Sequence, residues 1–226
     1  MSAAAAVTPA DRIRNAWLGR ISGCQLGKPV ELYAMQRGHA ALQEYLASGD
    51  ALPLRDYIPF VENPLVVANA AACKGRIQKA IPDDDINYSY LALHLLEQHG
   101  AAMTTADVAR AWLKLLPAAA TFTAERAAYA TLLNKMHDWF PEGRDPGFDL
   151  AECSDNPYND WIGAQIRADV YGWVCPGNLP LAAELARRDA ALSHRGDGID
   201  GAVWVAAMGA AIPVSSSMEE AARRAL

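Results

Sequence analysis

Apolar residues recur at intervals of three and four along most of this chain, a spacing that predicts amphipathic α-helices. Near the N-terminus, Ile13, Trp17 and Ile21 fall on one helical face, which we expect to contact the core. Runs of alternating apolar and polar residues bounded by turns, which would indicate strands, do not occur in the sequence. The pattern therefore predicts an all-α protein.

Polar, Gly- and Pro-rich stretches separate the expected helices, and Thr or Ser residues open several of them. The helices are predicted over residues 9–22, 35–48, 83–99, 105–116, 123–138, 161–171, 180–192 and 201–211. Their expected N-cap residues are Thr8, Thr104 or Thr105, and Thr123. A last helix start at Ser217 lies so close to Leu226 that we expect the chain to be C-terminally truncated.

Three adjacent carboxylates, Asp83, Asp84 and Asp85, follow Pro82 and open a long apolar segment. Pro82 disfavours a helical conformation at the preceding residue, so a helix is expected to begin at the aspartates. One carboxylate can cap that helix and favour its dipole. Three neighbouring carboxylates repel one another, and a hard cation such as Mg²⁺ or Mn²⁺ relieves that repulsion. The triplet is therefore either a capped helix start or part of a metal site.

A second candidate segment runs from Gly23 to Glu31 and contains Gly27 and Pro29. Two glycines and a proline in nine residues predict a loop that allows close backbone approach and presents Glu31 at its end. A solvated surface carboxylate is the alternative for Glu31, because most lone Glu side chains are exposed.

Composition and charge exclude several other classes of function. The 226 residues are 52% hydrophobic, and the formal net charge of −6 without a basic block argues against nucleic-acid binding. Four widely spaced cysteines predict free thiols, and neither a signal peptide nor an uncharged apolar run of membrane-spanning length is found. We expect one domain covering residues 1–226 and a cytoplasmic location.

Four segments in this order resemble the ADP-ribosylglycohydrolase family, whose founding members remove ADP-ribose from modified proteins. They are Gly23–Glu31, Pro82–Asp85, Trp161–Arg167 and Ser193-His194. The resemblance covers about residues 11–212 and implies a compact orthogonal multi-helix bundle. It also implies a hydrolase that uses Mg²⁺ or Mn²⁺, in a dinuclear site, and acts on ADP-ribosylated protein or a small ADP-ribosyl compound.

The resemblance also assigns roles to individual residues. It implies Asp83, Asp84, Asp85 and Glu31 as metal ligands, with Glu31 and Asp84 in catalysis. The substrate-binding residues that it implies are Gly27, Gly163, Arg167, Ser193 and His194. From the residues themselves, Arg167 has the alternative of pairing with Asp169 or Asp160, and His194 of satisfying a helix C-terminus.

Two departures from the family pattern leave other functions open. Pro82 and Asp85 stand where the family's metal motif has threonines, and nothing after residue 200 matches the family's second metal motif. An ADP-ribose-binding protein without strong catalysis is therefore one alternative. A prenyl-diphosphate enzyme is another, because Asp83, Asp84 and Asn87 half fit its aspartate motif, but Gly163 and Arg167 stand where its second motif needs other residues.

Overall fold

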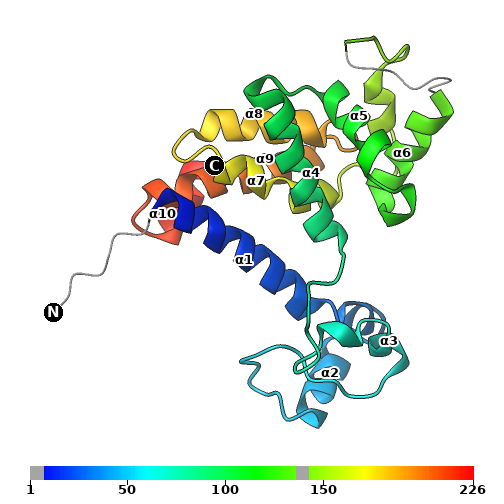
Figure 1. Ribbon diagram of the computed structural model, residues 1–226, viewed down its shortest axis with the longest axis vertical. Coiled ribbons are helices and arrows are strands. Elements are labelled where there is room, and N and C mark those ends of the chain that lie inside the picture. Colours follow the sequence, from blue (N-terminus) through cyan, green and yellow to red (C-terminus); the bar gives the residue numbers. More distant parts are fainter. Residues whose placement is uncertain (1–7, 136–142) are drawn as a thin grey trace. The chain divides into compact units, whose positions relative to one another are not determined.

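The computed structural model describes residues 8–135 and 143–226, and Figure 1 shows its helices as coiled ribbons. No strand occurs in those two ranges, so the all-α prediction is confirmed. The chain forms two compact units, Met1–Ile86 and Asn87–Leu226, each described here by itself.

The first unit contains two long helices and a series of short turns. Its elements are α1 (Pro9–Gly27), α2 (Glu31–Ser48), α3 (Pro64–Val67), the 3-10 turn η1 (Ala70–Ala72) and the first turn of α4 (Asp84–His99). Thr8 caps α1 as predicted, because its Oγ1 accepts the backbone N–H of Asp11 at 3.1 Å and the Asp11 carboxylate accepts the Thr8 N–H at 3.2 Å. Ile13 is 38% exposed, however, so its expected place in the core was wrong.

The predicted loop from Gly23 to Glu31 is mostly helix. α1 continues to Gly27, and only three residues separate it from α2. Gln25 explains the continuation, because its buried amide accepts the N–H of Ile81 at 2.8 Å and donates to the Ile81 carbonyl at 3.2 Å. A contact made 56 residues away in sequence thus overrides the local effect of two glycines.

Tyr45 organises the apolar core of the first unit. Its hydroxyl donates to the Pro59 carbonyl at 2.9 Å and accepts the Val61 N–H at 3.0 Å, which fixes the long connection between α2 and α3. Buried apolar side chains from both helices and from the connection surround it. They are Val30, Leu46, Ile58, Val66 and Cys73. The connection is therefore an ordered part of this unit.

The second unit contains the remaining helices, which Figure 1 colours from green to red. Its further α-helices are α5 (Thr105–Leu115), α6 (Thr123–Lys135), α7 (Asp169–Trp173), α8 (Leu179–Ala190), α9 (Asp197–Ala211) and α10 (Met218–Ala225). Its 3-10 turns are η2 (Gly100–Ala102), η3 (Ala118–Ala120), η4 (Leu150–Ser154), η5 (Ile162–Arg167) and η6 (Ile212–Val214). The helix predicted over 161–171 is thus divided into η5 and α7, and the predicted end of the helix at 123–138 lies outside the described residues.

Small residues let α9 pack closely against its neighbours α7 and α8. A Cβ atom at Gly172 in α7 would lie 2.4 Å from the Ala206 carbonyl oxygen and 2.9 Å from the Gly209 Cα, so only glycine fits there. The segment Asp197–Val214 has the length and hydropathy of a membrane-spanning helix. The alanine-lined face that α9 buries against this unit makes a core helix the simpler explanation.

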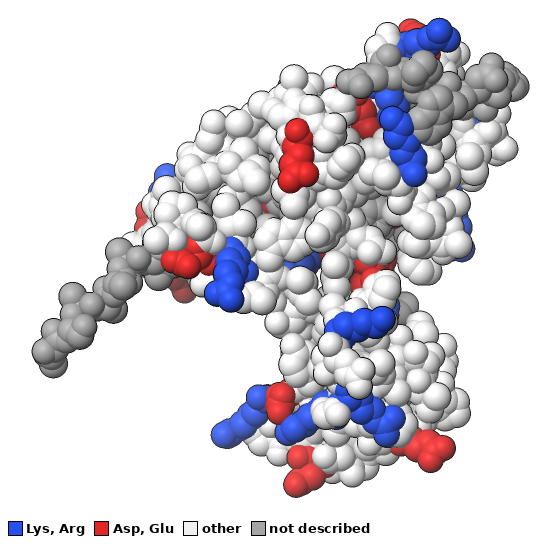
Figure 2. Space-filling view, in the orientation of Figure 1, with Lys and Arg blue, Asp and Glu red and all other residues white. Residues whose placement is uncertain are grey.

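On the face drawn in Figure 2, acidic and basic side chains occur in small separate groups among uncharged residues. This agrees with a sequence in which 20% of the residues are charged and both signs are well represented.

A buried ionic network joins several elements of the second unit. The Arg167 guanidinium is 1% exposed; it donates to Glu125 Oε1 at 2.6 Å and contacts the Asp189 carboxylate. The Tyr171 hydroxyl donates to the other Asp189 oxygen at 2.5 Å. The Arg167 Cζ atom lies over the Trp112 ring, 5.2 Å from the ring centroid. These contacts tie α6, α7, α8 and η5 to one buried cation.

Replacing Arg167 by Met should leave Glu125 and Asp189 buried without their counter-ion. We expect a loss of roughly 3–5 kcal/mol in the free energy of unfolding, measured by urea denaturation. Arg187→Met is the matched control, because Arg187 is half exposed and only 4.0 Å from Asp200 in a surface pair. Its loss should stay below about 1 kcal/mol. Equal losses in both variants would contradict a stabilising role for the network.

Candidate functional site

The acidic triplet is at the start of α4, as the sequence predicts. Asp83 caps the helix, because its Oδ1 accepts the backbone N–H of Asp85 at 3.0 Å and its carbonyl accepts the N–H of Ile86 at 3.2 Å. The capping interpretation is therefore correct for Asp83. It accounts for one carboxylate of the three and leaves the purpose of the other two open.

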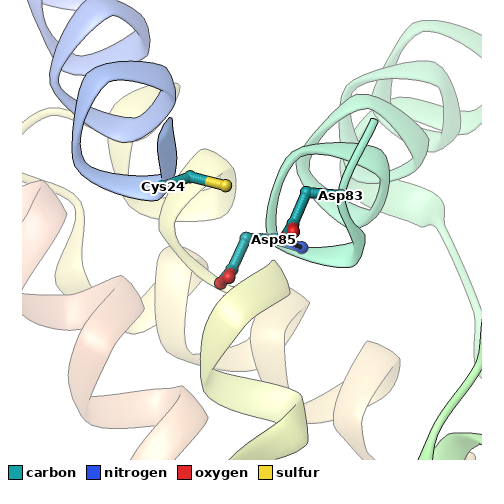
Figure 3. Close-up of side chains that lie close together, drawn as sticks. All are labelled: Cys24, Asp83 and Asp85. Atoms are coloured by element: carbon teal, nitrogen blue, oxygen red, sulfur yellow. Dashed lines mark hydrogen bonds between the residues drawn. The ribbon is translucent and has the colours of Figure 1, made fainter. Parts of the chain in front are cut away.

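Two of the carboxylates share a small space with a thiol from α1. The Sγ of Cys24 and one carboxylate oxygen each of Asp83 and Asp85 all lie within 4.8 Å of one another, and Figure 3 shows the three side chains. Asp84 and Glu31, which the resemblance implies as further metal ligands, do not belong to this close group. Cys24 was not expected in it.

Two basic side chains offset part of this negative charge. The Lys28 ammonium contacts Asp83 Oδ2 directly and lies 3.5 Å from Glu31 Oε2. Arg20 donates from Nε to the Asp85 carbonyl at 2.9 Å, and its guanidinium is 3.9 Å from the Asp85 carboxylate. Asp83, with a side chain only 3% exposed, therefore has a protein partner on each of its two oxygens, and each oxygen retains a second lone pair.

Burial and mutual repulsion both raise the pKa values of these carboxyl groups, and the neighbouring cations oppose that effect. Burial disfavours the charged form of Asp83, but the Lys28 ammonium outweighs it and lowers the pKa of Asp83. Burial and the Asp83 charge raise the pKa of Asp84 to about 6. Burial likewise raises the pKa of Cys24 to about 12, so its thiol is protonated at neutral pH.

A cavity of about 340 Å³ opens beside this cluster. Its wall includes Asp83, Asp85 and Glu31 on the acidic side and Gly23 and Gly27 on the α1 side. A Cβ atom at either glycine would meet nothing within 4 Å, so glycine is not required there by packing within the protein. Gly27 thus borders open space, and its implied contact with substrate stays a prediction.

The donor set fits a divalent cation in part. Asp83 and Asp85 offer two close carboxylates, which suit Mg²⁺ or Mn²⁺, and such ions usually keep several water ligands. The protonated Cys24 thiol is a poor ligand for a hard cation. The two carboxylates therefore suit one ion that completes its coordination with water or substrate oxygens.

The other predicted substrate-binding residues lie together in the second unit, within the buried network. Arg167 donates to Ser193 Oγ at 2.8 Å, and Ser193 Oγ is 2.8 Å from His194 Nδ1. A Cβ atom at Gly163 would lie 2.5 Å from the Glu125 carboxylate. Glycine at this position therefore makes room for Glu125, which is a structural reason for it.

This geometry favours the structural alternative for Arg167, although with other partners than the expected Asp169 or Asp160. Both of its acidic partners, Glu125 and Asp189, are buried with it. Burial and the Arg167 charge lower the pKa of His194 to about 3, so its imidazole is neutral. The His194 Nε2 atom has no hydrogen-bond partner among the described residues. The substrate-binding roles of both residues stay predictions.

Sequence reasoning missed Glu125 and Asp189, although helical spacing carries a signal for both. In α8, Ala182, Leu185 and Ala186 are buried, and Asp189 follows on the same face. In α6, Glu125 similarly shares a buried face with Ala128. A carboxylate on the apolar face of a helix predicts a buried partner of opposite charge.

Comparison with known proteins agrees with the resemblance. The family model described as ADP-ribosylglycohydrolase matches residues 5–226. No curated protein and no solved structure matches the chain. The match covers nearly the whole chain, including the acidic triplet and the buried network, and it sets aside the prenyl-diphosphate alternative. The chain belongs to the ADP-ribosylglycohydrolase family.

Proposed function

We propose that this protein is a metal-dependent hydrolase that cleaves the glycosidic bond between ADP-ribose and a protein or small molecule. The observation that carries the proposal is the acidic cavity of the first unit, in a chain of this family. Asp83, Asp85 and Glu31 line that cavity together with Gly23 and Gly27, where a Cβ atom would meet nothing within 4 Å. A ribose with its hydroxyl groups suits such a wall, because carboxylates accept hydrogen bonds from hydroxyls.

The carboxylates have separate tasks in this proposal. The reacting carbon of ADP-ribose passes through an oxocarbenium-like state, which fixed negative charge stabilises. Asp84 or Glu31 accepts the proton of the attacking water. Glu31 is the more accessible of the two, with a side chain that is 55% exposed, and it borders the cavity.

Asp83 and Asp85 are the residues that would hold the divalent cation. When bound there, Mg²⁺ or Mn²⁺ polarises a water molecule and orients ribose oxygens. Arg20 and Lys28 hold the two carboxylates in place from the side of α1. The four cysteines among the described residues are free thiols, which agrees with the cytoplasmic location that we also propose.

Release of ADP-ribose tests the proposed reaction most simply. The protein with Mn²⁺ or Mg²⁺ should release ADP-ribose from an ADP-ribosylated protein or small molecule. Glu31→Gln should reduce the rate at least about 100-fold, because it removes the candidate base that borders the cavity. Asp56→Asn, an exposed carboxylate paired with Lys74 in the same unit, should leave the rate unchanged. Binding of ADP-ribose without release would instead support the binding-protein alternative.

Thermal unfolding tests the cation separately. Mn²⁺ at 100 times its Kd should raise the Tm of the wild type by about 5–10 °C, because the ion binds only the folded chain. Asp85→Asn should remove most of that increase, whereas Asp56→Asn should keep it. An equal increase in wild type and Asp85→Asn would show that the ion binds elsewhere.

A further inference from the structure

Lys28 occupies an unusual position for a basic residue beside a proposed metal site. It follows Gly27 at the end of α1, and its ammonium group lies between Asp83 Oδ2, which it contacts, and Glu31 Oε2 at 3.5 Å. Both carboxylates are residues that the family resemblance implies as metal ligands. The Lys28 ammonium group thus occupies the space between these two carboxylates, and a second metal ion bound by both would need the same space.

The pair with Asp83 is well shielded from solvent. The Asp83 side chain is 3% exposed and that of Lys28 is 21% exposed. An ion pair with so little access to water is weakened little by salt, and its charge acts strongly on its surroundings. Lys28 is therefore a fixed component of the site and differs from an exposed surface lysine in this respect.

The formal charge of the cluster also favours one bound cation over two. Asp83, Asp84, Asp85 and Glu31 carry four negative charges, and Lys28 and Arg20 carry two positive ones, so the formal charge is −2. One divalent cation balances this charge, whereas a second would leave a positive excess in a half-buried site. The close group that remains for the single ion contains Asp83, Asp85 and Cys24.

We propose that Lys28 is a built-in counter-ion that limits this acidic site to one divalent cation and weakens the binding of that cation. The inference rests on the proposed function, because it takes the cluster to be the metal site. Lys28 acts through Asp83 and Glu31 and touches no reacting atom, so it is a positioning residue that sets metal stoichiometry and affinity.

Binding of Mn²⁺ alone to the whole chain, measured by calorimetry and by the electron paramagnetic resonance of free Mn²⁺, tests the proposal. The wild type should bind at most one ion. Lys28→Met, which keeps the length of the side chain without its charge, should bind Mn²⁺ at least about tenfold more tightly, since a repulsion of about 1.4 kcal/mol is lost. Lys28→Arg keeps the charge and should bind like the wild type.

Lys74→Met is the matched control, because it removes the same charge from the same unit. Lys74 pairs with the exposed Asp56 at 2.9 Å and should have no effect on Mn²⁺ affinity beyond about twofold. Circular dichroism of each variant in EDTA verifies that it is folded, and Lys28→Gln is the second uncharged variant if Lys28→Met does not fold. In that case, Mn²⁺ affinity about tenfold higher in Lys28→Gln than in the wild type supports the proposal, and equal affinity overturns it.

The outcomes separate this inference from the proposed function. Two Mn²⁺ ions per wild-type chain, or equal affinity in wild type and Lys28→Met, overturn the role of Lys28 and leave the hydrolase proposal intact. Binding of Mn²⁺ by Lys28→Met and not by the wild type supports the inference and contradicts the metal dependence of the proposed hydrolase. Absence of binding in every folded variant overturns both the inference and the metal site on which it rests.

Discussion

Repulsion among three adjacent carboxylates is the constraint that shapes the first unit. Asp83, Asp84 and Asp85 are all at least half-buried in one helical turn, so each needs a positive partner. The backbone N–H groups at the start of α4 supply part of this positive charge. Arg20 of α1 and Lys28, which follows α1, supply more of it. The negative charge that still remains is what makes this place suitable for a cation.

In the second unit, the acidic side chains are buried around a cation instead of lining a cavity. There a single buried cation, Arg167, satisfies two buried carboxylates, and Tyr171 and Ser193 complete the hydrogen bonds. The two carboxylates exceed the guanidinium by one formal negative charge, and burial raises the pKa of Glu125. All three groups are buried and paired with one another, so the network is closed to solvent. The same family motifs therefore contain an open acidic cluster in one unit and a closed ionic network in the other.

Local signals in the sequence were sufficient to predict the fold class and most of the residues at which helices begin. Thr8, Thr104 and Ser217 cap their helices as predicted, because a capping hydrogen bond involves residues only three apart. Long-range contacts were not predictable in this way. Gln25 keeps Gly23–Gly27 helical through Ile81, and Cys24 reaches the acidic triplet from α1. The roles of the site residues and the single-domain organisation stay predictions.

The position of a bound cation tests the account most directly. Crystals of the protein grown with Mn²⁺ give an anomalous scattering signal that locates the ion independently of any activity. The account predicts one peak within coordination distance of the Asp83 and Asp85 carboxylates, with the Lys28 ammonium still between Asp83 and Glu31. Two peaks at the triplet, or a peak only at a distant site, would contradict it.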